Sequence, residues 1–398
     1  MAVTRRYGRR VIADLHCHYA MHLIESAEQP KLRHALRRGR PFRDHVRALV
    51  MWVANRIANF RKWSAGPRVT FEKLEEGGAR LVLSVLYVPF DEMDLGLPYG
   101  APPQPGYPSE LLAQLKHVEE DLQARDAAGT RHVIATRASD LDGDRIAFVH
   151  CIEGGFHLGA TPEEIDAQVT NLARRGVVYI TLAHLFWRQV ATNSPALPFF
   201  SDRWYDRLFP QPTGEGLTEL GIAAVRAMAR ERVLVDLAHM RDDAITETLD
   251  LLDELAPGLP VLASHAGVRF PKSSQRYQLA DDTVRRIGQR AGVVGLILAQ
   301  HQLNDGIRRT RTRRLSETVD VLCRHIDRIA ELSGPGHVGL GSDFDGFIKP
   351  TMGGLETAGD LALLREPLLA RYDATEVDGF LYGNARRVVE SALAARAH

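Results

Sequence analysis

The chain has 398 residues, of which 45% are hydrophobic and 25% are charged, a composition typical of a folded globular protein with a large core. Fifty basic residues balance fifty acidic ones, so no overall field favours nucleic acid or a membrane as a partner. Three cysteines are too few for a disulfide framework, and the first residues lack an apolar segment with a cleavage site, so we expect a cytoplasmic protein.

Eight short apolar, β-branched runs recur along the chain. They cover residues 11–19, 79–88, 145–155, 177–185, 233–240, 260–267, 292–299 and 337–346. The runs are apolar throughout, as expected for parallel strands buried on both faces, and segments with helical apolar spacing lie between most of them. This alternation predicts an α/β fold, a single-domain (β/α)8 TIM barrel over residues 1–398. No Gly-rich phosphate turn follows an early run, which argues against a dinucleotide-binding fold.

Three long segments follow the predicted strands 1, 2 and 4, at 19–78, 89–144 and about 186–216. Because the mouth of such a barrel lies at the carboxyl ends of its strands, we expect these segments to cap the mouth. The first contains a basic helical insertion at about 22–70. Within residues 31–62, ten Lys or Arg face one acid, Asp44, which indicates a solvated helix face or attraction of an anionic substrate. The apolar stripe of residues 46–60 favours a lid or a homodimer contact over a membrane surface.

Side chains that can bind metal or move protons end most of the predicted strands. His16 and His18 are one residue apart, so they share a strand face and could chelate one ion. Because the carboxyl ends of parallel strands meet at one rim, one metal site explains the whole set better than separate structural roles. The set is His16, His18, Glu153, His184, His239, His265, Asp343 and Asp345.

Several of these residues could have a role other than metal binding. Glu153 could bond the barrel backbone, although the two glycines after it favour a tight turn that something can approach closely. His184 could bind metal, donate to an oxyanion or be structural, and spacing does not rank these roles. Asp343 and Asp345 would share a face, so that one could act in catalysis while the other bonds nearby loops. Other histidines, including His301, match no site spacing and are interpreted as structural.

The motifs EGG, YITLAH, GLTELG, VLVDLAH, PVLASHAG and VGLGSDFDG, which run in this order within about residues 145–390, resemble the membrane (renal) dipeptidase family. These enzymes are zinc peptidases of the amidohydrolase superfamily. The resemblance implies two zinc ions per chain. Glu153 would bridge them, His16 and His18 would bind the first ion, and His239 and His265 would bind the second.

The same resemblance implies roles toward a substrate. His184 would contact the substrate carbonyl and stabilise its oxyanion, Arg276 would grip the substrate's carboxylate, and Asp343 would exchange protons with the attacking water and the leaving amine. We therefore expect hydrolysis of the amide bond of dipeptides or similar small N-acyl amino acids by a metal-bound hydroxide.

Two alternatives stay open. One is another hydrolase of this superfamily, acting on a non-peptide amide, a lactone or a phosphoester. The other is a non-catalytic metal-binding barrel. The presence of both His184 and Asp343 weighs against the second alternative, because a binding protein needs no proton shuttle.

Two residues depart from the family pattern. The first motif is usually His-x-Asp, but residue 18 is His. A neutral imidazole in place of a carboxylate removes one negative charge from the first metal's surroundings, which shifts the site toward softer metals such as zinc. Tyr277 follows Arg276 where an Asn is more usual. The His-x-His motif is the feature that keeps the other hydrolase reactions open.

Overall fold

The structure, a computed structural model, describes residues 11–23, 41–58, 66–127, 129–307, 311–348 and 350–394. Its centre is a sheet of parallel strands in the order β1-β2-β4-β5-β6-β7-β8-β9, with β3 paired beside β4. The strands are β1 (Ile12–Cys17), β2 (Ala79–Leu86), β3 (His132–Ile134), β4 (Ile146–Glu153), β5 (Tyr179–Thr181), β6 (Leu234–Asp236), β7 (Leu262–Ala266), β8 (Val293–Leu296) and β9 (Val338–Leu340).

The sheet curls into a ring in which β1 and β9 meet. A parallel bridge between Cys17 and Phe344 joins the two ends. The eight strands of this ring match the eight predicted runs, which confirms the TIM barrel. The extra strand β3 was not predicted, because it has only three residues and these are only partly buried. It pairs with the start of β4, whereas β5 pairs with the last two residues of β4.

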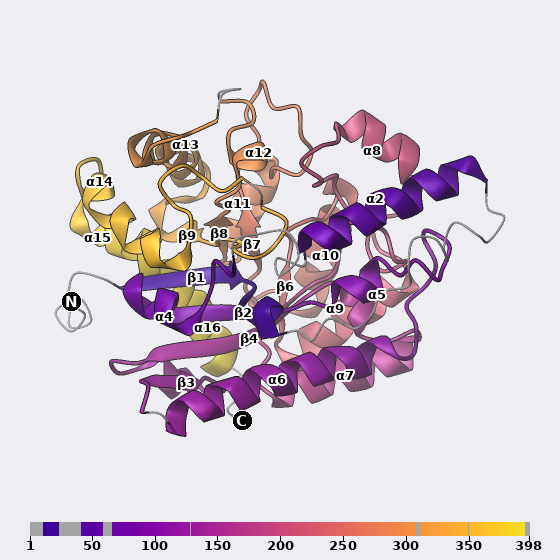
Figure 1. The fold of residues 1–398 in the computed structure, drawn as a ribbon, viewed down its shortest axis with the longest axis horizontal. Coiled ribbons are helices and arrows are strands. Elements are labelled where there is room, and N and C mark those ends of the chain that lie inside the picture. The colour runs from indigo at the N-terminus through magenta and orange to yellow at the C-terminus, as the bar shows by residue number, and fades with distance from the viewer. Residues whose placement is uncertain are drawn as a thin grey trace.

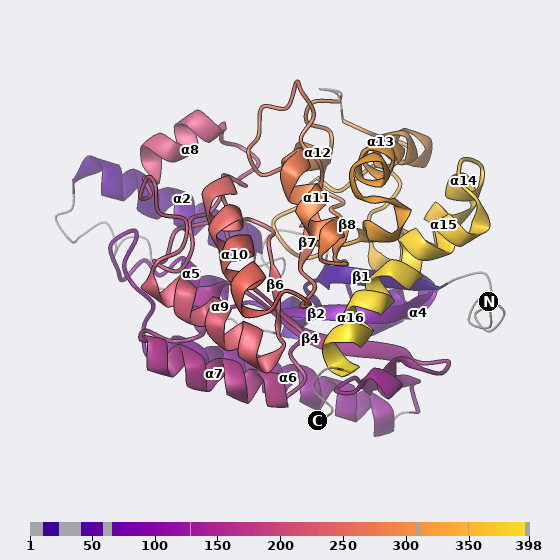
Figure 2. The ribbon, with the colours of Figure 1, turned by 180° about the vertical axis from the view of Figure 1, so that it is seen from behind.

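Helices surround the strands on all sides (Figures 1 and 2). They are α2 (Phe42–Ala58), α4 (Phe71–Glu76), α5 (Pro89–Glu92), α6 (Tyr107–Ala127), α7 (Pro162–Arg174), α8 (Asp202–Leu208), α9 (Glu219–Glu231), α10 (Asp242–Leu255), α11 (Asp281–Gln289), α12 (Gln300–Leu303), α13 (Leu315–Ser333), α14 (Arg365–Leu369), α15 (Ala374–Asp378) and α16 (Asn384–Ala394). None of the helices within the described ranges is long and apolar enough to cross a bilayer.

Helix α7 illustrates why these segments are helical. The Thr161 side chain accepts a hydrogen bond from the Glu164 backbone N–H, and Pro162 occupies the first turn, where its missing N–H costs nothing. Ile165, Val169 and Leu172 then form one buried stripe, because residues four and seven positions apart lie on the same helix face.

The turn after β4 places Glu153 at the mouth of the barrel. Gly154 has a φ of +98°, a backbone conformation that favours glycine. A Cβ atom on Gly154 would lie 2.3 Å from the Phe156 ring, and one on Gly155 would lie 3.0 Å from the Leu182 carbonyl oxygen. The two glycines therefore form the tight turn that the EGG motif predicts.

The basic insertion contains α2, whereas its residues 24–40 and 59–65 lie outside the described residues. Ala48, Met51 and Ala54 are buried, and the Arg47 side chain donates to the Leu208 carbonyl at the end of α8. Figure 1 shows α2 between α5 and α8. The apolar stripe thus packs on the protein's own capping helices, in agreement with a lid, although Phe42 is 82% exposed.

Candidate active site

The predicted metal-binding and proton-transferring residues all lie at the carboxyl ends of the barrel strands. His16 and His265 are in β1 and β7, Glu153 ends β4, and His18 directly follows β1. Three others stand three residues past the ends of β5, β6 and β9: His184, His239 and Asp343. The backbone of His239 and Asp343 is left-handed, with φ of +64° and +55°. Such conformations are strained for residues other than glycine and cluster at functional sites.

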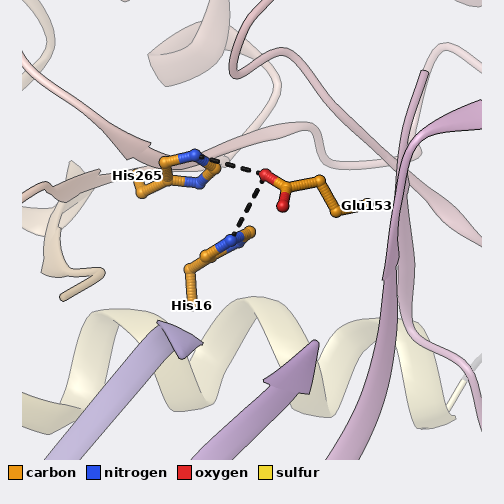
Figure 3. Close-up of side chains that lie close together, drawn as sticks. All are labelled: His16, Glu153 and His265. Atoms are coloured by element: carbon orange, nitrogen blue, oxygen red, sulfur yellow. Dashed lines mark ion pairs between the residues drawn. The ribbon is translucent and has the colours of Figure 1, made fainter. Parts of the chain in front are cut away.

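Five imidazoles surround the Glu153 carboxylate. Each has its Nε2 atom 3.4–3.5 Å from one of the two carboxylate oxygens, and they belong to His16, His18, His184, His239 and His265. Figure 3 shows the rings of His16 and His265 facing the same oxygen. Glu153 is 1% exposed, and among the residues that the structure describes neither of its oxygens has a hydrogen-bond partner.

A buried carboxylate without a partner is costly, so this centre calls for a cation or a proton. Burial, with Asp343 nearby, raises the pKa of Glu153 well above its usual value. Burial and the surrounding imidazoles lower the pKa of His16 and His239, and burial lowers the pKa of His265 to about 4. The three imidazoles are therefore neutral at pH 7, the form that binds metal.

The spacing of these atoms fits metal ligands. Two ligands that each lie 2.0–2.1 Å from one tetrahedral zinc ion are about 3.3–3.4 Å apart. The Nε2 atoms around Glu153 lie at that distance from its oxygens. Two other pairs are closer than this spacing: His18 Nε2 is 3.1 Å from Asp343 Oδ1, and the Nε2 atoms of His239 and His265 are 2.8 Å apart. Three overlapping groups can hold an ion: His16 with Glu153 and His265, His16 with His18 and Asp343, and Glu153 with His184 and His239.

Hydroxyl groups behind two of the rings determine their tautomers. The Tyr179 hydroxyl donates to the Leu15 carbonyl and lies 2.9 Å from His16 Nδ1. The Ser264 hydroxyl donates to Asp236 and lies 2.8 Å from His265 Nδ1. Because each hydroxyl has already donated its proton, its oxygen accepts an Nδ1–H from the ring. The Nε2 lone pairs of both rings are thus left free to face Glu153.

His184 is held by a carboxylate that the sequence motifs do not reveal. Its Nδ1 lies 2.7 Å from Glu92 Oε2, on the short helix α5 after β2. Burial raises the pKa of Glu92, but the His184, Tyr87 and Phe186 contacts outweigh burial and lower it overall. A carboxylate shortly after a strand of a predicted barrel was the available signal, but Glu92 lies in a segment interpreted only as a capping loop.

Asp343 and Asp345 have separate contacts. Asp343 faces His18, as described above, and its N–H donates to the His16 carbonyl oxygen. Asp345 accepts the backbone N–H groups of Arg68 and Val69. Asp345 thus bonds a nearby loop, and the catalytic role of Asp343 stays a prediction. The predicted alternation along a strand does not apply to these two aspartates, because β9 ends at Leu340 and both residues lie in the loop that follows.

A narrow recess opens beside these residues. His301 lines it together with His184, His239 and Asp343, and Phe347 and Ile348 are also in its wall. His301 also borders a wider outer cavity, so it lies between that cavity and the recess. Sequence spacing assigned His301 a structural role, because no motif marks it and only the short helix α12 after β8 brings it to the recess.

The structure does not bring Arg276 into the imidazole cluster. Its guanidinium is 40% exposed and pairs with Asp206 at 2.7 Å and with Asp202 at 3.3 Å, both on α8. The next residue does reach the cluster. The Tyr277 hydroxyl donates to the His265 carbonyl at 2.7 Å, and its ring centroid is 5.0 Å from that of His239. The role of Arg276 toward a substrate stays a prediction.

Comparison with known proteins identifies the family. The family model described as "Membrane dipeptidase (Peptidase family M19)" matches residues 11–398. The chain belongs to the membrane dipeptidase family. The match confirms the resemblance seen in the motifs and the enzyme class that it implied, a metal-dependent dipeptidase.

Individual relatives of this membrane dipeptidase family member are distant. A protein in the pqqA 5' region of Klebsiella pneumoniae is 27% identical over 292 residues, which cover 72% of this chain and 98% of that protein. Dipeptidase 3 of Mus musculus is 26% identical over 260 residues, 64% of this chain and 46% of the mouse protein. The chain therefore matches only about half of the length of Dipeptidase 3.

A solved structure supports the fold. The metallo peptidase from Rhodobacter sphaeroides, liganded with a phosphinate mimic of the dipeptide L-Ala-D-Ala, superposes with a TM-score of 0.67. It is 22% identical, and the match covers 96% of this chain and 99% of that chain. At 22% identity this likeness shows that the two proteins share the barrel fold, and it does not assign the individual site residues.

Proposed function

We propose that this membrane dipeptidase family member hydrolyses the amide bond of dipeptides and similar small N-acyl amino acids at a two-zinc centre gathered around Glu153. One observation carries the proposal. A buried carboxylate that has no hydrogen-bond partner among the described residues stands among five Nε2 atoms at ligand spacing. Such a cluster is costly without a cation and favourable with one.

The proposed ligands are those that the family resemblance implied, with Glu153 shared between His16 and His18 on one side and His239 and His265 on the other. When bound, zinc at such a centre supplies a Lewis acid and lowers the pKa of water to about 7. His18, a neutral ligand in place of a carboxylate, favours zinc over harder divalent ions.

The remaining side chains serve the substrate. Asp343 accepts the proton of the attacking water and returns it to the departing nitrogen. His184 Nε2 donates to the substrate's carbonyl oxygen as negative charge develops there, a contribution of about 3 kcal/mol for one donor. Arg276 binds the terminal carboxylate in a two-pronged hydrogen bond after leaving Asp206. The narrow recess beside His184 and Asp343 supports small substrates.

The cellular location and the assembly state belong to the proposal as well. The three cysteines are too few for a disulfide framework and all are buried, which supports a reducing, cytoplasmic compartment. The exposed side chains Phe42 and Leu49 of α2 leave room for a homodimer contact on the outer face of that helix.

The test combines metal analysis of the purified protein with a screen of L,L- and L,D-dipeptides. We expect two metal equivalents per chain, turnover of at least one dipeptide, and loss of turnover on chelation that added zinc restores. His18→Asp, assayed alongside, should keep two sites and bind manganese more tightly relative to zinc. Two metal equivalents without turnover of any dipeptide would overturn the proposed reaction.

A further inference from the structure

Glu92 is a fully buried carboxylate at the edge of the candidate site, with an exposed fraction of 0%. Its Oε1 accepts the backbone N–H of Phe186 at 2.7 Å. Its Oε2 accepts the Tyr87 hydroxyl at 2.6 Å and lies 2.7 Å from His184 Nδ1. All three neighbours therefore approach Glu92 at hydrogen-bond distance.

The chemistry of these neighbours determines which proton lies where. A backbone N–H can only donate, and the Tyr87 hydroxyl donates to Oε2, so both oxygens of Glu92 act as acceptors. Only a carboxylate offers acceptors on both sides, because an amide would turn an NH2 group toward one donor. The hydrogen bond to His184 is then an Nδ1–H donated to Oε2.

This hydrogen bond also fixes the direction of the His184 ring. With Nδ1 tied to Glu92, Nε2 lies 3.4 Å from Glu153 Oε2 and faces the recess. The Tyr87 ring packs edge-on against His184, with centroids 4.6 Å apart. The Tyr87 backbone is itself held by Gln114, whose side chain bonds both its N–H and its C=O. Hydrogen bonds and a ring contact thus hold the residues behind His184 in place.

We propose that Glu92 is the positioning residue of His184: it binds Nδ1–H and presents Nε2 to the oxygen on which charge develops during amide hydrolysis. The inference rests on the proposed function of His184. Glu92 contacts His184, Tyr87 and the backbone of Phe186, so it acts on the reaction through the imidazole. Removal of a carboxylate that supports a metal-bound histidine typically costs about 10–100-fold in activity, and we expect the same range for the support of His184.

The neighbouring residue Asp91 offers a matched control. Asp91 is on the same turn of α5 and is 3% exposed. Its Oδ2 lies 3.3 Å from His157 Nδ1, a different imidazole from the one that Glu92 holds. Asp91→Asn therefore removes a buried carboxylate from the same helix without touching the imidazole that Glu92 holds.

The kinetic experiment compares Glu92→Gln and Asp91→Asn in the zinc-loaded enzyme. For Glu92→Gln we expect kcat to fall about 10–100-fold while KM stays within about threefold. The affinity for a phosphinate analogue of the same dipeptide should fall by the same factor as kcat/KM, because a tetrahedral analogue reports transition-state binding. Asp91→Asn should leave these quantities unchanged. A Glu92→Gln enzyme with wild-type kcat, or with a change in KM alone, would overturn the inference.

A second measurement does not depend on turnover. In protein labelled with 15N in histidine, His184 should give a downfield Nδ1–H proton signal that is assigned by its loss in His184→Gln. We expect the signal to remain in Asp91→Asn and to disappear in Glu92→Gln. If Glu92→Gln does not fold, Glu92→Asp withdraws the oxygen and should weaken the same signal. Its persistence without Glu92 overturns the inference, whereas a wild type that cleaves no dipeptide overturns only the proposed function.

Discussion

The Glu153 centre is predicted to bind metal and the Arg276 loop to bind the substrate's carboxylate. The two charges differ in whether they already have a partner. The carboxylate of Glu153 is buried and without a hydrogen-bond partner in the described part of the chain. The guanidinium of Arg276 is 40% exposed and already paired with Asp202 and Asp206. A strand end thus presents an unsatisfied charge to a ligand, whereas a loop presents a satisfied charge that must exchange partners.

This difference separates large effects from small ones. At the centre, a missing ligand leaves a charge in a low-dielectric environment, where electrostatic free energies are large. At the loop, water screens the ion pairs, and each exposed pair is worth about 0–1 kcal/mol. Changes at the centre should therefore abolish function, and changes at the loop should tune it.

The largest effect is expected from Glu153→Gln. The neutral amide cannot balance cations, so we expect loss of bound metal and at least about a 10³-fold loss of dipeptide hydrolysis. Without metal, the variant should be more stable than the wild type, because it has no buried carboxylate to leave unpaired. Metal analysis, activity assays and thermal unfolding of chelated protein measure the three quantities. Cys151→Ala, two residues earlier in β4, is the control and should keep metal and activity.

Arg276→Ala comes next. If the guanidinium binds the substrate's carboxylate, its loss removes a charge-assisted pair of hydrogen bonds, and KM should rise about 10–100-fold with a smaller change in kcat. Arg230→Ala is matched, since Arg230 is also half exposed and also pairs with two acids, Asp166 and Glu231. Steady-state kinetics on one cleaved dipeptide decide the point. Equal KM values for the two variants would remove Arg276 from the substrate site.

Asp206→Asn tests whether the ion pair between Asp206 and Arg276 competes with substrate binding. It frees Arg276 from one competitor, so KM should fall by up to about fivefold, the range of an exposed ion pair. The fall should shrink in high salt, which screens the pair in the wild type as well. An unchanged KM at low salt would mean that Asp206 does not compete with the substrate. Asp250→Asn, which removes an exposed partner of Arg286, is the control.

Asp91→Asn tests a third state of a buried carboxylate, one that holds a proton. Burial raises the pKa of Asp91 from 3.8 to about 7, so the unfolded chain releases this proton first as pH rises. Wild-type stability should fall between about pH 4 and pH 7 by at most about 4 kcal/mol from this group, and the variant should lack that fall. Denaturant titrations at pH 5 and pH 8 measure it. Parallel changes in wild type and variant would contradict the prediction.

The barrel was predictable because its signal is local. Each strand is a short apolar run, and the order of runs and helices leaves few topologies open. The site residues were predictable for a related reason, since parallel strands place their carboxyl ends at one rim. His16, Glu153 and His265 are in strands or end them, so alternation and strand direction suffice to bring them together.

Glu92 and His301 could not be assigned to the site from the sequence, because the contacts that place them there join distant segments. Glu92 is 92 residues from His184 along the chain, and His301 lines the recess from the short helix α12 after β8. The short strand β3 was missed because three partly buried residues carry no clear pattern.

The amino-acid sequence alone determined the strands, their direction and the histidines and acids at their ends, because backbone hydrogen bonding and burial act over a few residues. Tertiary packing decided which nitrogen of each imidazole faces Glu153, which carboxylate holds His184, and that Arg276 is already paired. Those features depend on atoms from distant segments meeting within about 3 Å, the length of a hydrogen bond, and hydrophobic periodicity contains no information at that scale.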